Sequence, residues 1–197
     1  MDPKVFALMA FAAGVVIWAV LAYNRLVALR AQFRNAFAQI EVQLRRRFDL
    51  VPNLVEIARK YMEHERATLE AVIVARNLAT HATQRASAAP GDLRAMQGLS
   101  QAAGMLSGSI GRLMVVAEAY PELKADARMG ELAEELSSTE NRVAFARQAY
   151  NDAVTDYNVA IGVFPVSLVA AVFGFAPSRQ LNAAEIPAHR EAVRVQF

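Results

Sequence analysis

The sequence predicts an all-α protein in which an N-terminal transmembrane helix continues into an antiparallel up-down four-helix bundle with long, coiled-coil-like helices. Three observations support this prediction. Residues 5–23 contain no charged side chain. The remaining chain is rich in Ala, Leu, Glu, Gln and Arg, which favour helix over strand. Its apolar residues recur every three or four positions, the period of a helix with one buried face.

Residues 5–23 are long enough to cross a bilayer. A helix rises about 1.5 Å per residue, so this run reaches about 28 Å, close to the thickness of the hydrocarbon core. We expect Val5, Phe11, Trp18 and Tyr23 to anchor the chain, with the last two near the interface. A cleaved secretory signal is the alternative, but the run is longer than the usual signal core of about 7–15 residues.

The basic residues are placed unevenly around this run. Lys4 is the only basic side chain before it, whereas six arginines follow, at positions 25, 30, 34, 45, 46 and 47. Because basic flanks stay on the cytoplasmic side, residues 1–4 are expected outside the plasma membrane and the bundle in the cytoplasm.

Residues 24–163 carry four predicted helices. The first, 24–48, continues the anchor without a break, and its apolar stripe comprises Leu26, Leu29, Phe33, Phe37, Ile40 and Leu44. Pro52 marks a restart or a kink, so the second helix is expected over 52–84. These bounds give the first helix about 36 Å outside the anchor and the second about 50 Å, an unequal pair.

The third and fourth helices differ in character. The third, 93–119, follows a turn at 86–92 and carries four glycines. The spacing of Gly104, Gly108 and Gly111 indicates either close packing on a neighbouring helix or a loosely formed helix. The fourth, 126–163, has a large apolar residue every seven positions, with alanines three residues after the middle members. This repeat predicts a coiled-coil-like seam. Its large members are Met129, Leu136, Val143, Tyr150, Tyr157 and Phe164.

Up-down topology returns the fourth helix to the bilayer surface, where residues 164–175 carry no charge. Pro165 and Gly174 interrupt this segment, which is short for a span. We interpret it as an interfacial or re-entrant element. Capping of the bundle core and a second span are the alternatives. Its expected lipid contacts are Phe164, Leu168, Phe173 and Phe175, and residues 176–197 are expected to form an extended or poorly ordered tail.

Composition and motifs argue against several classes of function. The chain has no cysteine, which removes disulfides and thiolate chemistry, and its net charge of +2 indicates no nucleic-acid partner. None of the three histidines belongs to the Glu-x-x-His pair of di-iron bundles, and Glu63-His64-Glu65 lacks a second histidine at helical spacing. We therefore predict no metal, no cofactor and no enzymatic activity.

Two polar stripes and an arginine cluster are the candidate interaction residues. The stripes predict hydrogen bonds between helices or between subunits, with solvated surface as the alternative. They comprise Gln32, Asn35, Gln39, Gln43 and Arg46 on the first helix, and Glu140, Arg147, Asn151 and Asn158 on the fourth. Arg45, Arg46 and Arg47 are expected about 35 Å from the bilayer. They either recruit an anionic partner or complement the dipole at a helix C-terminus.

Several short motifs, taken together and in order, resemble the LemA family and related magnetosome-associated membrane proteins. They are Tyr23-Asn24, Arg45-Arg46-Arg47-Phe48-Asp49-Leu50-Val51-Pro52-Asn53-Leu54-Val55, His64-Glu65, Tyr120-Pro121-Glu122-Leu123-Lys124, Thr139-Glu140-Asn141-Arg142, Tyr150-Asn151-Asp152-Ala153-Val154, Phe164-Pro165 and Phe173-Gly174-Phe175. The resemblance implies one N-terminal membrane helix and a cytoplasmic helical bundle. It carries over no catalytic residue, and the glycine-rich third helix departs from it.

These observations favour a non-enzymatic scaffold that contacts membrane lipid and self-associates as a homo-oligomer to organise or shape the membrane. The alternative is an adaptor or regulatory partner of another membrane protein, such as a protease or a transporter. A self-associating scaffold predicts oligomers in mild detergent, whereas an adaptor predicts one dominant partner in native membranes.

Overall fold

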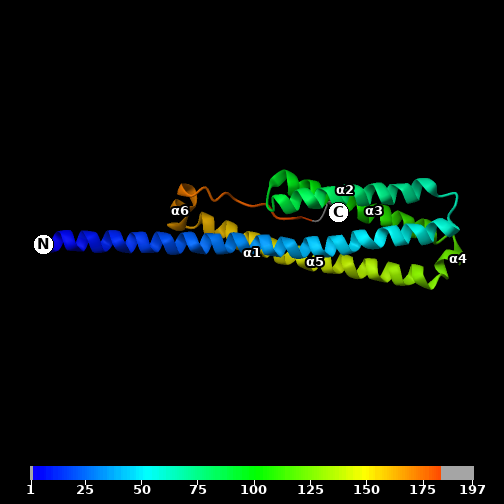
Figure 1. Ribbon diagram of the computed structural model, residues 1–197, viewed down its shortest axis with the longest axis horizontal. Helices are drawn as coiled ribbons and strands as arrows, with labels where there is room; N and C mark the ends of the chain where they lie inside the picture. The colour runs from blue at the N-terminus through cyan, green and yellow to red at the C-terminus, as the bar shows by residue number, and fades with distance from the viewer. Residues whose placement is uncertain (1, 183–197) are drawn as a thin grey trace, which may run out of the picture.

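A single unbroken helix, α1 (Pro3–Tyr61), runs through almost the whole length of the molecule (Figure 1). The structure is a computed structural model that describes residues 2–182 and is helical throughout its regular parts, with no strand in that range. The other helices are α2 (Arg66–Ala88), α3 (Leu93–Ala117), α4 (Pro121–Lys124), α5 (Ala127–Gly162) and α6 (Val166–Val172). The predicted all-α bundle with one long apolar N-terminal helix is confirmed.

The predicted boundary between the first two helices is wrong. Pro52 lies inside α1, which continues to Tyr61, and α2 begins only at Arg66. A proline has no N–H, so the carbonyl of Phe48 loses its helical partner. Nε of Arg76, on α2, donates to that carbonyl oxygen at 3.2 Å. A partner from a neighbouring helix therefore compensates for the missing bond, and α1 passes through the proline.

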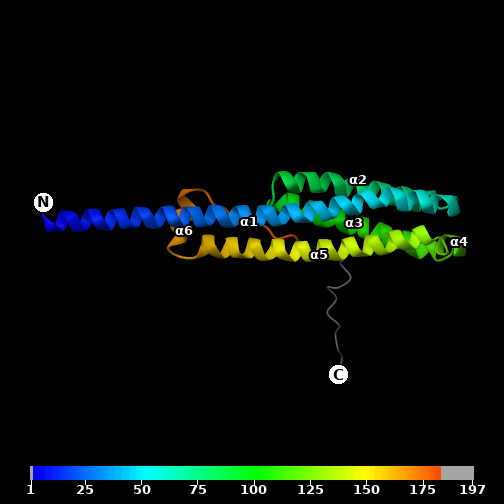
Figure 2. The same ribbon diagram turned by 60° about the horizontal axis from the view of Figure 1, so that its bottom comes forward.

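The corrected bounds reverse the predicted difference in length between the first two helices. Outside the anchor, α1 reaches about 57 Å and α5 about 54 Å, whereas α2 and α3 each reach about 36 Å. The two long helices lie antiparallel along their length, and the short pair covers only the end farther from the anchor (Figures 1 and 2). The membrane-proximal half of the α1–α5 pair is covered instead by α6 and the segment that follows it.

The core lies mainly between the predicted stripe of α1 and the heptad face of α5. Phe33 packs on Tyr157 with ring centroids 5.1 Å apart, and Phe37 packs on Tyr150 at 5.6 Å. The members of the α5 repeat from Met129 to Tyr157 are buried or half-buried. Phe164, the last member, falls beyond the end of α5 and is exposed. The repeat thus specifies the core only where the chain remains helical.

Three of the four glycines of α3 have open space beside them. The helix is regular, and a Cβ atom added at Gly98, Gly108 or Gly111 would meet no atom within 4 Å. The expectation of tight backbone contact is therefore wrong at Gly108 and Gly111. The glycine that does require its small size is Gly91, in the turn before α3, where φ is +89° and a Cβ atom would lie 2.8 Å from Cβ of Ser178.

The N-terminal part of α1 projects alone beyond the bundle (Figure 1). Nearly all of its side chains up to Leu21 are exposed, and burial begins at Ala22 and Leu26. Within residues 2–182, α1 is the single unbent helix with the length and apolar character of a membrane span. The pair α5–α6 reaches that threshold only if the two helices are taken together across a bend of 95°.

The contact between Arg76 and Phe48 generates a prediction about stability. Arg76→Ala should lower the free energy of unfolding by about 1 kcal/mol, because the Phe48 carbonyl loses its donor. In a Pro52→Ala background, the restored backbone N–H of residue 52 can donate to the Phe48 carbonyl. Arg76→Ala should therefore lower the free energy of unfolding by less in that background. Denaturant unfolding of the full chain in mild detergent, followed by circular dichroism, measures both costs. An equal cost in the two backgrounds would contradict this account of how α1 passes through Pro52.

Candidate functional site

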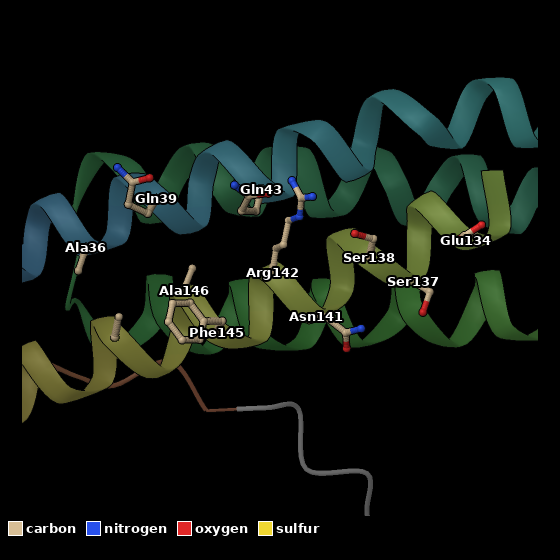
Figure 3. Close-up of a pocket in the computed structure, with 11 residues that line it drawn as sticks. Ala36, Gln39, Gln43, Glu134, Ser137, Ser138, Asn141, Arg142, Phe145 and Ala146 are labelled. Carbon is tan, nitrogen blue, oxygen red and sulfur yellow. The ribbon is translucent and has the colours of Figure 1, made fainter. Parts of the chain in front are cut away.

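An open groove of about 760 Å³ runs along the outer side of the α1–α5 pair, about midway along the bundle (Figure 3). Its volume is within the range of binding sites for small ligands or side chains of a partner. Small residues line much of it, and amide, hydroxyl and guanidinium groups line the rest. The lining residues are Ala36, Gln39 and Gln43 of α1, and Glu134, Ser137, Ser138, Asn141, Arg142, Phe145, Ala146 and Ala149 of α5.

Two side chains give this groove its character. Phe145 lies on its rim and is 77% exposed, which is unusual for an aromatic ring on a water-facing helix. Oε1 of Gln43 is buried and has no hydrogen-bond partner within residues 2–182. Buried polar atoms are normally paired, so this atom is an unusual acceptor beneath the groove wall, whereas the amide of Gln39 is exposed to the groove. The groove therefore offers both an apolar and a polar contact.

The three consecutive arginines do not form a patch. Successive residues on a helix point about 100° apart, and the three side chains separate accordingly. Arg45 pairs with Glu41 on the same helix at 2.6 Å, Arg46 pairs with Glu135 on α5 at 2.8 Å, and Arg47 points into the bundle. Because α1 continues to Tyr61, the cluster is not at a helix C-terminus, and the expected dipole role is wrong.

Arg47 joins three helices. It is only 4% exposed, and its guanidinium donates to Oγ of Ser107 on α3 at 3.1 Å and to Oε2 of Glu140 on α5 at 3.3 Å. Oγ of Ser107 in turn donates to Oε1 of Glu140 at 3.2 Å. Burial lowers the pKa of the Arg47 guanidinium, and the Glu140 carboxylate opposes that shift. Glu140 therefore makes the cross-helix contacts expected of the polar stripe, with its own side chain 55% exposed at the surface of the bundle.

Asn151 and Asn158, the two asparagines of that stripe, bind residues 176–182 of the chain's own tail. Each side-chain amide exchanges two hydrogen bonds with a tail residue, Asn158 with the backbone of Ser178 and Asn151 with that of Leu181, at 2.8–3.2 Å. The preceding tyrosine in each pair adds one more. Tyr157 donates to the carbonyl of Ala176 at 3.0 Å, and Tyr150 donates to that of Arg179 at 2.8 Å.

The spacing of these contacts explains why residues 176–182 are extended, while the rest of the predicted tail, 183–197, lies outside the described residues. Asn151 and Asn158 are one heptad apart, about 10 Å along α5. Ser178 and Leu181 are three residues apart, about 10 Å in an extended chain. Their separations match, so successive Tyr–Asn pairs of α5 hold successive triplets of the tail. Leu181 is buried, and the N–H of Arg179 donates to the carbonyl of Gly91 at 2.9 Å.

The remaining predicted residues occupy simpler positions. Asn35 is exposed on α1, and Arg147 is half-buried on α5. Val5, Phe11, Trp18 and Tyr23 lie on the exposed N-terminal part of α1. Phe164, Leu168 and Phe173 are exposed at the end of the bundle beside Tyr23, and Phe175 is half-buried there. His189 lies outside the described residues.

Several residues of the groove were missed by the sequence reasoning. Gln39 and Gln43 belong to a predicted stripe, but Ser138, Arg142 and Phe145 were not singled out. The one available signal was Phe145, an aromatic residue outside the heptad positions of α5. Residues 2–182 bring together no cluster of three or more His, Asp or Glu side chains that could hold a metal ion.

An apolar N-terminal span, a bundle that begins on the same helix and an open groove between its two long helices define a membrane-anchored helical-bundle protein. The sequence model of the LemA family matches residues 36–197, which is most of the chain. The chain therefore belongs to the LemA family.

Three curated relatives are similar at lower identity. Magnetosome proteins MamQ 1 and MamQ 2 of Paramagnetospirillum magneticum are each 25% identical over 171 residues. Magnetosome protein MamQ of Magnetospirillum gryphiswaldense is 25% identical over 168 residues. Each match covers 78% of this chain but only 62% of the relative, so the chain spans less than two thirds of their length.

The three-helix contact around Arg47 predicts a difference between two glutamates. Glu140→Ala should lower the free energy of unfolding by about 2 kcal/mol, because it leaves the buried Arg47 guanidinium without its carboxylate. Glu135→Ala removes the partner of the exposed Arg46 and should cost less than about 1 kcal/mol. Denaturant unfolding of both variants measures these costs. Equal losses would show that Arg47 is no more dependent on its carboxylate than Arg46.

The tail contacts predict a pH dependence. Burial raises the pKa of Tyr150 to about 12, from about 10 in the unfolded chain. The folded state therefore favours the neutral phenol of Tyr150. The contribution of this phenol to the free energy of unfolding is complete below pH 10 and should be lost as the pH rises to about 12. Tyr150→Phe should cost about 1 kcal/mol at neutral pH by removing the bond to Arg179. It should also make unfolding less sensitive to pH above 10, as measured by denaturant unfolding between about pH 8 and pH 12. A pH profile equal to that of the wild type would contradict this account.

Proposed function

We propose that this protein is a non-enzymatic scaffold whose copies associate side by side through the α1–α5 groove and so organise or shape the membrane. The observation that carries the proposal is the continuity of α1. The same helix provides the membrane span and one wall of the groove. A contact made in the groove therefore acts on the anchor through a rigid helix, with no hinge between them.

Membrane anchoring restricts how two copies can meet. Because α1 of every copy enters the same bilayer in the same direction, neighbouring bundles stand parallel. If two such copies form a symmetric pair, their two-fold axis is parallel to the bundles. Each surface of one copy then contacts the same surface of the other, at the same distance from the bilayer. Gln43 stands about 30 Å beyond Tyr23 in every copy. The groove of one copy thus faces the groove of the next, far from the bilayer.

The side chains of the groove suit such a contact. The exposed ring of Phe145 can enter the neighbouring groove over the small side chains of Ala146 and Ala149. Aromatic residues at the centre of an interface supply much of its binding energy. The exposed amide of Gln39 supplies a donor and an acceptor beside it.

The setting is part of the same proposal. The basic flank after the span favours residues 1–4 outside the cell and the bundle in the cytoplasm. The names of the relatives assign them to the magnetosome. A membrane-organising role for this chain, which matches 62% of their length, is proposed by similarity to them.

An adaptor for another membrane protein is the competing function. The same groove would then receive a different chain, and the protein would purify as a monomer from which crosslinking in native membranes recovers one dominant partner. Recovery of self-crosslinks alone would argue against an adaptor. The mass of the purified protein therefore separates the two functions.

The proposal predicts the effect of a charge on the rim of the groove. Mass measurement in mild detergent should show oligomers of the wild-type chain, and Phe145→Asp should weaken association at least about tenfold. Val115→Asp is the matched control, because Val115 is equally exposed but lies on α3 outside the groove. It should associate as the wild type does. A strict monomer at every concentration of the wild type would contradict the proposal.

A further inference from the structure

The short helix α6 lies at the level where the membrane span ends. The ring of Tyr23, the last residue of the uncharged run in α1, packs on Phe173 with centroids 4.8 Å apart and on Phe175 at 5.7 Å. These two phenylalanines follow α6 directly. The helix is therefore held beside the end of the anchor rather than elsewhere on the bundle (Figure 1).

The direction of α6 is equally defined. The chain bends by 95° between α5 and α6. Since α5 runs alongside α1 (Figure 2), α6 is close to perpendicular to the helix that spans the bilayer. A helix perpendicular to a span lies in the plane of the membrane. At about 10 Å, α6 is also too short to cross it.

The two faces of α6 differ in burial. Val169 and Ala170 pack onto the bundle, whereas Val172 is 78% exposed and Phe164, just before the helix, is 76% exposed. Leu168 and Phe173 are exposed as well. The sequence has no charged residue between Asp156 and Arg179. A capping role accounts for Val169 and Ala170 but leaves the exposed apolar residues without a partner within the chain.

From these observations we propose that α6 is a lipid-binding foot, with Phe164, Leu168, Val172 and Phe173 seated in the interfacial layer of the membrane that α1 spans. Lipid is the occupant because the exposed face adjoins the exposed face of the span, at one depth and without a charge between them. Interfacial elements bury an apolar face at the boundary between headgroups and acyl chains in this way.

The foot is fixed at both of its ends. α5 leads into it, and the tail that follows is held along α5 by Asn158 and Asn151. The α6 segment therefore keeps its position relative to α1, and each copy presents two rigid contacts to the bilayer. The second contact widens the footprint on one leaflet only, which deepens the proposed membrane-shaping function without depending on self-association.

The absence of cysteine allows a direct test with single-cysteine variants. The full chain with Leu168→Cys or Val172→Cys is labelled at the new cysteine with a nitrobenzoxadiazole fluorophore. Each labelled protein is reconstituted in vesicles of phosphatidylcholine and phosphatidylglycerol. Val115→Cys marks the water-exposed far end of the bundle, and Val16→Cys marks the span. Nitroxide lipids labelled near the headgroup or near the chain end report depth, and added dithionite reports contact with water.

The two α6 positions should be quenched more by the shallow nitroxide than by the deep one. Dithionite should reduce them at least about fivefold more slowly than position 115, as expected for a side chain at the acyl boundary. Dithionite rates equal to those at position 115, with no quenching by lipid, would overturn the proposal. Stronger quenching by the deep nitroxide than by the shallow one would do so too, in favour of a second span.

A repeat in the Phe145→Asp background separates the foot from self-association. Shallow lipid quenching that persists in this variant supports the foot even if the protein proves to be a monomer. A different outcome would overturn the proposal: no lipid quenching in either background, together with protection from dithionite in the wild-type background that is lost in Phe145→Asp. That result would show that a second copy, and not lipid, covers α6.

Discussion

The continuity of α1 is the constraint on which the rest of the molecule depends. A helix that leaves the bilayer and continues for about 57 Å fixes the axis, the height and the direction of everything packed on it. Its one weak point is Pro52, where the backbone bond to the Phe48 carbonyl is missing and Arg76 replaces it from α2. The short helices thus do more than cover the apolar stripe of α1. One of them, α2, also supplies the hydrogen bond that α1 lacks at Pro52, and both the groove and the anchor depend on α1.

The bundle is closed by two different means along its length. At the far end α2 and α3 complete the core in the usual way, and the contacts of Arg47 with Ser107 and Glu140 join α1, α3 and α5. Nearer the membrane the short helices have ended, and the chain's own tail takes their place. Polar Tyr–Asn pairs hold this part, because an extended backbone must have its N–H and C=O groups satisfied. The same hydrogen bonds keep α6 beside Tyr23.

Prediction from sequence succeeded where a pattern is local and repeats. The uncharged run at 5–23 identifies a helix, which the structure leaves exposed beyond the bundle. The stripe from Leu26 to Leu44 and the heptads of α5 each identify a helix and its buried face, and the structure places those two faces in the core. Prediction failed at Pro52 because the proline rule considers only the helix that contains the proline, whereas the compensating donor lies 28 residues away. The glycines of α3 misled for a similar reason, since their spacing suggests a face but does not show whether a neighbour packs on it.

The sequence by itself determined that this chain is helical, that its N-terminal part suits a membrane and that polar stripes flank its core faces, because each property depends on the chemistry of neighbouring residues. Only the tertiary structure decided what those stripes contact. Glu140 meets a buried arginine, Asn151 and Asn158 meet the tail, and Gln43 and Phe145 border an open groove. Within α5, Glu140, Phe145 and Asn151 lie only five or six residues apart and face three different neighbours. Which neighbour each one meets depends on how far each helix extends and where the chain turns back.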